Sequence, residues 1–84
     1  MTNKEILKKQ IIYRSTHRGT KEMDLLLGNF VKKNIDSLDI FELNTLIELM
    51  DIEDEILHKW YFNKIDDNKI PSNKISQMLK EFKI

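Results

Sequence analysis

This chain offers little that could form an active site. Its histidines and hydroxyl groups are too few or too scattered for catalysis, and it has no thiol. The sequence has two histidines, His17 and His58, and no cysteine, which excludes thiolate ligands and a cysteine nucleophile. Neither histidine lies in a metal-binding pattern such as His-Glu-x-x-His. Ser15 and Thr16 stand beside His17, but no suitably placed acid accompanies them as a nucleophilic triad requires. We therefore expect no catalytic residue and no metal site.

Phosphate-binding and calcium-binding patterns are also missing from the sequence. The only glycines are Gly19 and Gly28, so no glycine-rich loop can cradle a phosphate. The acidic stretch at residues 66–68 lacks the alternation and the glycine of a calcium-binding loop. We interpret the acids of residues 51–55 as a helix start, where the helix dipole favours negative charge. The sequence thus predicts no cofactor, and a protein that binds another protein rather than an enzyme.

One short polar segment stands out where the first predicted helix ends and the second begins. One interpretation of it is purely structural: Gly19 is the N-cap of the second helix, Glu22 reaches back to the cap N–H, and Arg18 is an exposed charge. The other is functional: Gly19 lets another backbone approach closely, while Arg18 donates and Glu22 accepts hydrogen bonds to a partner. Arg14 and Asp24 extend the same polar patch.

The spacing of apolar residues is helical almost throughout the chain and predicts an all-α fold in a single domain, residues 1–84. Alternating apolar runs and Asn-Gly or Asp-Gly turns, which would indicate strands, are absent. Five helices are expected, at residues 3–15, 20–34, 39–50, 52–63 and 73–82. Start signals for three of them are Thr2 with Glu5, Asp39 with Glu42, and Pro71-Ser72. Apolar positions include Ile6, Leu7, Ile11 and Ile12 in the first helix, Met23, Leu26, Leu27, Phe30 and Val31 in the second, and Ile40, Leu43, Ile47 and Met50 in the third.

Charge is balanced overall but unevenly distributed along the chain. The formal net charge is zero, yet residues 1–35 are mainly basic, whereas residues 36–55 contain acids and no base. The basic first third would suit an acidic partner or nucleic acid, or it would attract the acidic helices of the same chain. A small helical nucleic-acid-binding or regulatory protein is therefore one alternative, and an adaptor for another client is a second. The sequence pI of about 6.7 argues against nucleic-acid binding.

Location follows from what the sequence pattern lacks. No apolar run approaches the roughly 20 residues that span a bilayer. Charged residues interrupt residues 1–9, which is not the pattern of a secretory signal. We expect a cytoplasmic protein that binds neither membrane nor nucleic acid and is a monomer when free.

The polar segment and its surroundings resemble a known family. Arg18-Gly19-Thr20-Lys21-Glu22 matches the Arg-Gly-x-x-Glu signature of the succinate dehydrogenase assembly factor 2 family, also called SdhE or flavinator proteins. The resemblance extends over about residues 11–62, and more loosely over the last helix. Two departures concern the signature itself: Thr20 stands where the family usually has Met, and His17 where many members have a second basic residue. Further matching positions are Tyr13-Arg14-Ser15, residues 24–28, Phe30, Leu38, Glu42-Leu43, residues 46–51, Asp54 and Trp60.

This resemblance implies a compact five-helix bundle with a chaperone-like role. Members of the family bind the flavoprotein subunit of succinate dehydrogenase and promote covalent attachment of FAD to one of its histidines. Some members are also reported to act on the related fumarate reductase flavoprotein. The resemblance implies a partner-binding site with Gly19 as the close-approach point; the residues expected in it are Arg14, His17, Arg18, Gly19, Glu22 and Asp24.

Overall fold

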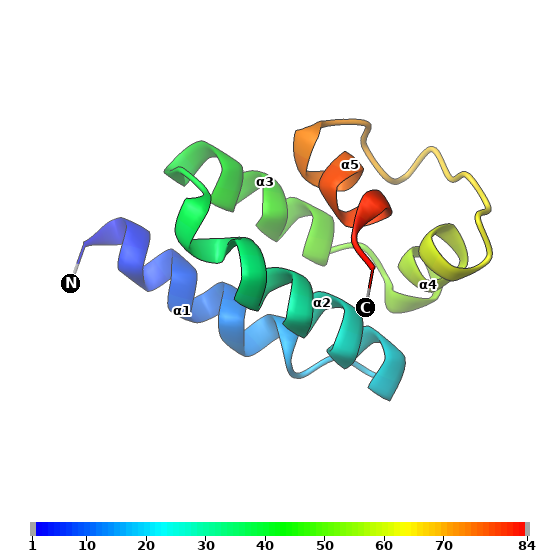
Figure 1. Ribbon diagram of the computed structural model, residues 1–84, viewed down its shortest axis with the longest axis horizontal. Coiled ribbons are helices and arrows are strands. Elements are labelled where there is room, and N and C mark those ends of the chain that lie inside the picture. Colours follow the sequence, from blue (N-terminus) through cyan, green and yellow to red (C-terminus); the bar gives the residue numbers. More distant parts are fainter. Residues whose placement is uncertain (1, 84) are drawn as a thin grey trace.

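Residues 2–83, the part of the chain that the computed structural model describes, contain five α-helices and one short 3-10 helix (Figure 1). No strand occurs among these residues, so the expected all-α, five-helix fold is confirmed. The elements in chain order are α1 (Asn3–Ser15), α2 (Lys21–Asn34), the 3-10 helix (Ile35–Ser37), α3 (Ile40–Met50), α4 (Asp54–Phe62) and α5 (Lys74–Glu81).

The helix starts differ slightly from the predicted ones because the capping residues are not themselves helical. Thr20, Asp39 and Asn73 are N-caps with extended backbone, and each side chain accepts a hydrogen bond from an amide of the first turn. The capping box of α3 is complete. The start signal assigned to Pro71-Ser72 was wrong, because α5 begins instead with a capping box between Asn73 and Ser76.

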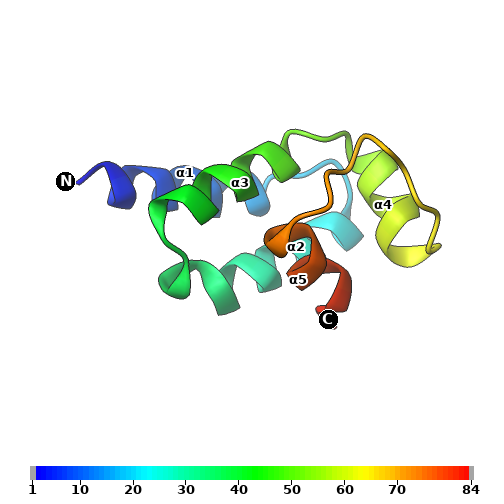
Figure 2. The same cartoon turned by 90° about the horizontal axis from the view of Figure 1, so that it is seen from above.

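The helices pack in two layers. In Figure 2, α1 and α3 lie side by side in one layer, α2 and α5 lie below them, and α4 occupies the end of the molecule away from the N-terminus. Helix α1 packs against both α2 and α3, and α5 packs against α3. The turn from α1 to α2 therefore comes close to the turn from α3 to α4. No helix among residues 2–83 combines the length and the apolarity needed to cross a membrane.

The hydrophobic core is built mainly from α2 and α3. Phe30 is fully buried, and its ring meets that of Phe82 edge to face at 5.5 Å between centroids. The apolar stripe predicted for α2 is entirely buried. Three of the other predicted apolar positions are instead exposed at the surface: Ile6, Ile12 and Ile40.

Helix α1 buries little of its apolar surface because its neighbours lie on only one side. Among its residues only Ile11 and Ser15 are buried. The adjacent Ile12 is 48% exposed, although the apolar spacing alone treats both isoleucines alike. Successive side chains of a helix point in directions about 100° apart around its axis, so residues adjacent in sequence face different surroundings.

Replacing these two isoleucines tests the orientation of α1. Ile11→Ala should lower the free energy of unfolding by about 2–5 kcal/mol, because it removes fully packed methyl groups. Ile12→Ala should lower it by less than about 0.5 kcal/mol, because the side chain is half exposed. Urea denaturation followed by circular dichroism measures both values. Equal losses would contradict the orientation described here.

An ion pair joins the first turns of α3 and α5. The Lys74 ammonium donates a hydrogen bond to Glu42 Oε2 at 2.7 Å, and Glu42 also accepts from the Asp39 amide. The hydrogen bond from Lys74 lowers the pKa of Glu42, and the bond from Asp39 adds to this effect. The same pair raises the pKa of Lys74.

The lowered pKa of Glu42 predicts a pH-dependent contribution to stability. A carboxyl whose pKa is lower in the folded state stabilises the fold above its unfolded pKa, and this stability is lost as the pH falls through the folded value. Glu42→Gln should therefore melt below the wild type at pH 7, and the two melting curves should converge in acid. Thermal denaturation across a pH series measures the difference. A gap that persists after Glu42 is protonated would refute the electrostatic explanation.

Candidate partner-binding site at the α1–α2 corner

The segment between α1 and α2 is held by side chains from three helices. We call residues 16–22 the α1–α2 corner. Helix α1 ends where the Thr16 hydroxyl lies 3.1 Å from the carbonyl oxygens of both Ile12 and Tyr13. The chain then runs through Arg18 and Gly19 before Thr20 begins α2.

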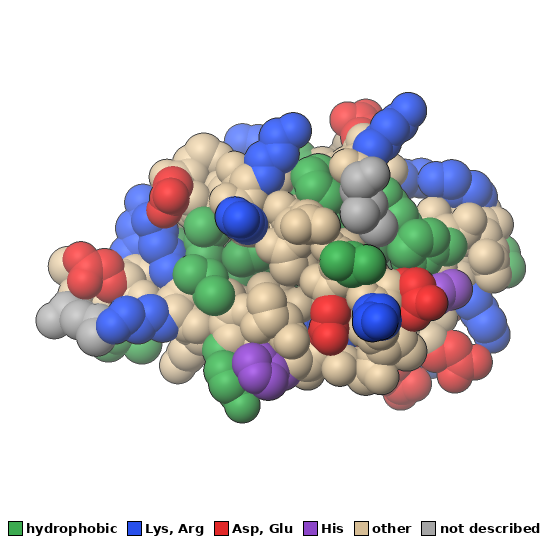
Figure 3. Space-filling view, turned by 60° about the horizontal axis from the view of Figure 1, so that its bottom comes forward, with side chains coloured by type: hydrophobic (Ala, Val, Ile, Leu, Met, Phe, Trp, Pro, Cys, Tyr) green, Lys and Arg blue, Asp and Glu red, His purple; other side chains and the backbone are tan. Residues whose placement is uncertain are grey.

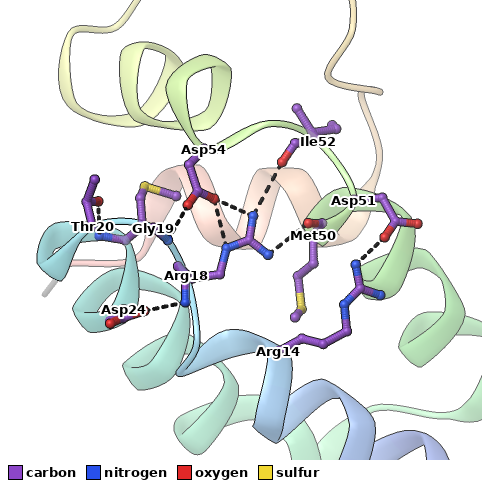
Figure 4. Close-up of polar contacts among 10 residues, drawn as sticks. Arg14, Arg18, Gly19, Thr20, Asp24, Met50, Asp51, Ile52 and Asp54 are labelled. Atoms are coloured by element: carbon purple, nitrogen blue, oxygen red, sulfur yellow. Dashed lines mark hydrogen bonds and ion pairs between the residues drawn. The ribbon is translucent and has the colours of Figure 1, made fainter.

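Arg18 points into the protein rather than toward solvent (Figure 4). Its Nε donates a hydrogen bond to Asp54 Oδ1 at 2.8 Å, and Nη1 donates to the Met50 carbonyl at 2.9 Å. Nη2 donates to the Ile52 carbonyl and completes a second bond to Asp54. The Arg18 side chain is only 10% exposed, so the interpretation of Arg18 as an exposed charge is wrong.

Two carboxylates hold consecutive backbone amides of the corner. The Arg18 amide donates to Asp24 Oδ1 at 2.7 Å, and the Gly19 amide donates to Asp54 Oδ2 at 2.8 Å. Asp54 therefore binds the guanidinium with one oxygen and the next residue's backbone with the other. Charge-assisted bonds of this kind are stronger than neutral ones, so the corner has a defined shape.

Gly19 is exposed, and neither its backbone nor its space requires a glycine. Its φ is not positive, and a Cβ built on it would lie 3.4 Å from Asp54 Oδ2 as its nearest contact. A side chain is therefore sterically acceptable within the folded chain. What the glycine leaves open is the solvent side of the corner.

The capping interpretation of Gly19 and Glu22 was wrong. Thr20 is the N-cap of α2, and its hydroxyl accepts from the Met23 amide at 3.3 Å. Thr20, which stands where the family usually has methionine, thus supplies the cap. Glu22 is exposed in the first turn of α2 and takes no part in the cap.

Arg14 precedes the corner in the last turn of α1, and His17 lies within the corner. Arg14 forms an ion pair with Asp51, the residue that ends α3. The His17 ring stacks on that of Tyr13, with 4.0 Å between centroids and 16° between planes. Both rings are exposed, so the two residues form an aromatic surface at the end of α1.

The turn from α3 to α4 contributes to the site in a way that the sequence patterns did not predict. The acids of residues 51–55 were assigned to a helix start, but two of them, Asp51 and Asp54, bind arginines of the first third of the chain. A third such pair joins Lys8 to Asp36 at 3.1 Å. These ion pairs support the interpretation that basic and acidic helices of the same chain attract each other. The available signals were this charge asymmetry and the family match at Asp54.

The candidate site thus unites Arg18, Gly19 and Asp24 directly, with Arg14 and His17 at its edges and Glu22 exposed beside it. Its arrangement offers an open backbone, an acceptor and an aromatic surface, which suits contact with another protein. Among residues 2–83, no group of three acidic or histidine side chains could hold a metal ion.

Comparison with known proteins shows which family the chain belongs to. A family model described as the flavinator of succinate dehydrogenase matches residues 9–83. The chain belongs to this family. The family resemblance found in the sequence is therefore confirmed.

Several members of the flavinator family are similar to the chain over most of its length. It is 40% identical over 58 residues to the mitochondrial succinate dehydrogenase assembly factor 2 of Arabidopsis thaliana, covering 69% of this chain and 31% of that protein. It is 32% identical over 73 residues to the FAD assembly factor SdhE of Acetobacter pasteurianus, covering 87% and 64%. A third relative, the mitochondrial assembly factor 2 of Meyerozyma guilliermondii, is 36% identical over 78 residues, covering 92% and 58%. The chain therefore spans between about a third and two thirds of these relatives, and no solved structure matches it.

The ion pair between Arg18 and Asp54 should contribute measurably to stability. Asp54→Ala should lower the free energy of unfolding by about 1.5–3 kcal/mol, because it leaves a mostly buried guanidinium with carbonyl acceptors but without its carboxylate. Glu55→Ala is the matched control: this neighbour forms an exposed pair with Lys59, which is worth about 0.3–0.5 kcal/mol. The double variant Arg18→Met with Asp54→Leu should lose less free energy of unfolding than the sum of the losses in Arg18→Met alone and Asp54→Leu alone. Additive losses, measured by urea denaturation, would show that the two side chains do not interact.

Proposed function

We propose that this protein binds the flavoprotein subunit of succinate dehydrogenase and promotes covalent attachment of FAD to it, without catalysing a reaction itself. Membership of the flavinator family supports the proposal, as do the names of its relatives, which are assembly factors for succinate dehydrogenase and for FAD. The FAD belongs to the client in this proposal. The fumarate reductase flavoprotein is a second client of the same class.

The observation that carries the proposal is the exposed glycine on a rigid corner. Gly19 is held through its amide by Asp54, yet the fold leaves room for a side chain there. A glycine lowers stability relative to alanine when nothing in the backbone requires it. The missing side chain is explained if the backbone of a partner packs against this point.

The six expected site residues divide into two groups by how exposed they are. Gly19, Glu22 and His17 are exposed and face the partner in this proposal. The other three, Arg14, Arg18 and Asp24, form bonds within the chain and give the corner its shape. Their substitution would change binding through the backbone of the corner rather than through a lost contact.

Binding alone is sufficient for the proposed activity. A protein that binds one conformation of its client more tightly than the others increases the population of that conformation. The flavinator would hold the flavoprotein in an arrangement in which its own groups form the bond to FAD. No catalytic side chain is needed on the small protein, in agreement with the sequence analysis.

The nucleic-acid-binding alternative loses support from the ion pairs. Three of the eight basic side chains of residues 1–35, those of Lys8, Arg14 and Arg18, form ion pairs with acids of the same chain, which reduces the free basic surface without removing it. Phosphate contacts need basic side chains that are available at the surface.

Location in the cytoplasm stays a prediction, since relatives include mitochondrial proteins as well as a bacterial one.

Substitutions at Gly19 test the proposal directly. Gly19→Ala should weaken binding to the flavoprotein and Gly19→Arg should abolish it, because each adds atoms at the closest point of approach. The melting temperature of Gly19→Ala should stay the same or rise slightly, since its Cβ meets only one carboxylate oxygen and alanine restricts the unfolded chain. Calorimetry with the purified flavoprotein measures affinity, and covalent flavin fluorescence after denaturation measures attachment. Normal binding by folded Gly19→Arg would show that another surface, or another client, is involved.

Glu22→Ala separates a role in binding from a role in the helix. Loss of this exposed acceptor should weaken binding by about 2–5 kcal/mol if its contact is desolvated in the complex. The effect on folding should be small, because Thr20 rather than Glu22 caps α2. Thr20→Ala is the control, since it removes the cap and should lower stability by about 1 kcal/mol. A Glu22→Ala variant that melts lower and binds normally would assign Glu22 to the helix after all.

A further inference from the structure

A groove runs along the outside of α1 and α2, next to the corner. Its volume is about 490 Å³, and its lining is mainly apolar. In Figure 3, where the lower side of Figure 1 comes forward, hydrophobic side chains reach the surface between charged ones. The residues that line it include Ile12, Thr16, Asp24, Leu25, Gly28 and Lys32.

The groove contains a glycine that the fold does not explain. Gly28 lies in the middle of α2, where glycine is less favourable than alanine because it leaves the backbone freer in the unfolded chain. Its φ is not positive. A Cβ at this position would lie 3.6 Å from Thr16 Cγ2 and 3.8 Å from the Ser15 carbonyl oxygen, which are ordinary contacts. The packing of α1 on α2 therefore does not require a glycine.

The walls of the groove are apolar and partly exposed. Ile12 is 48% exposed and Leu25 is 52% exposed, which leaves apolar surface of both helices in water. Deeper in the groove, Val31 and Ile35 are buried members of the core. Exposed apolar surface that flanks an unexplained glycine is what a protein interface leaves in the free protein.

The charges at the rim favour one kind of occupant. Asp36 is neutralised by Lys8, and Asp24 accepts the amide of Arg18. Lys32 also lines the groove, and among residues 2–83 it forms no ion pair. An apolar segment that carries an acidic residue at the Lys32 end would complement this surface.

We propose that this groove receives an apolar segment of the flavoprotein, with an acidic residue of that segment against Lys32. The inference rests on the proposed function and extends the interface beyond the corner. The two surfaces are continuous, because Thr16 of the corner also lines the groove, and so does Asp24, which accepts a hydrogen bond from the Arg18 amide. Gly28 forms the floor on which the segment lies, and Ile12 and Leu25 pack against its sides.

The decisive variant is Gly28→Ala, which should change stability and affinity in opposite directions. The melting temperature should rise by about 4–8 °C, because alanine is the better helix former and its Cβ fits. Binding to the purified flavoprotein subunit should weaken by about tenfold, because the added methyl group occupies the floor of the groove. A glycine that serves only the fold would give lower stability and unchanged affinity per folded molecule.

Matched pairs of variants test the walls and the charge. Ile12→Ala should weaken binding by about tenfold, whereas Ile40→Ala, an isoleucine of α3 with 47% exposure, should not change it. Lys32→Glu should weaken binding, whereas Lys69→Glu, the same change in the loop after α4, should have much less effect. Titration calorimetry at fixed ionic strength gives all the dissociation constants.

Three results would overturn the proposal in different ways. Wild-type affinity of Gly28→Ala and Ile12→Ala, together with loss of binding by Gly19→Arg, would exclude the groove and leave the proposed function standing. No binding of the flavoprotein by the wild type would refute both. Self-association of the free protein that Ile12→Ala removes, seen by analytical ultracentrifugation, would assign the groove to a second copy of this chain.

Discussion

The ion pair between Arg18 and Asp54 is the interaction on which the shape of the candidate site depends. Removing a guanidinium and a carboxylate from water is costly, and the geometry offsets this cost with several hydrogen bonds. The two residues are 36 positions apart, in the turn before α2 and at the start of α4. Asp54 also binds the Gly19 amide, so one carboxylate determines both where the arginine lies and how the exposed backbone is presented. The helices position the site, and this pair connects them at the point where function is proposed.

The helices themselves were predictable because their signals are local. Apolar residues at spacings of three and four, together with capping residues, give the bounds of α1 through α5 to within two residues. The error at Gly19 and Thr20 has a simple cause: both residue types suit an N-cap, and only the backbone shows which one is used. Apolar spacing also cannot show which side of a helix meets its neighbours. That is why Ile12 and Ile40 lie at the surface although they follow the pattern.

The contacts of the site were less predictable because they join distant parts of the chain. Sequence patterns identified Arg18 and Gly19 but not the inward direction of the arginine, which depends on how α4 packs. The acids at the start of α4 form an ordinary helix-start pattern, so the sequence did not indicate that Asp54 also binds an arginine. Opposite charge in the first third and the middle of the chain indicated attraction, but it could not identify the pairs. Both glycines of the chain occupy positions where the fold accepts a side chain, so contacts within the chain do not explain why they are glycines.

The distance in sequence between Arg18 and Asp54 also sets an order of events during synthesis. Helices α1 and α2 are complete when residue 34 has emerged from the ribosome, but the carboxylate that holds Gly19 lies 20 residues further on. Domains generally begin to fold from the N-terminus as the chain grows. Until α4 arrives, the nascent chain has the residues of the corner without their arrangement. The proposed binding surface thus forms only when most of the fold has formed, and chains that end before α4 lack it.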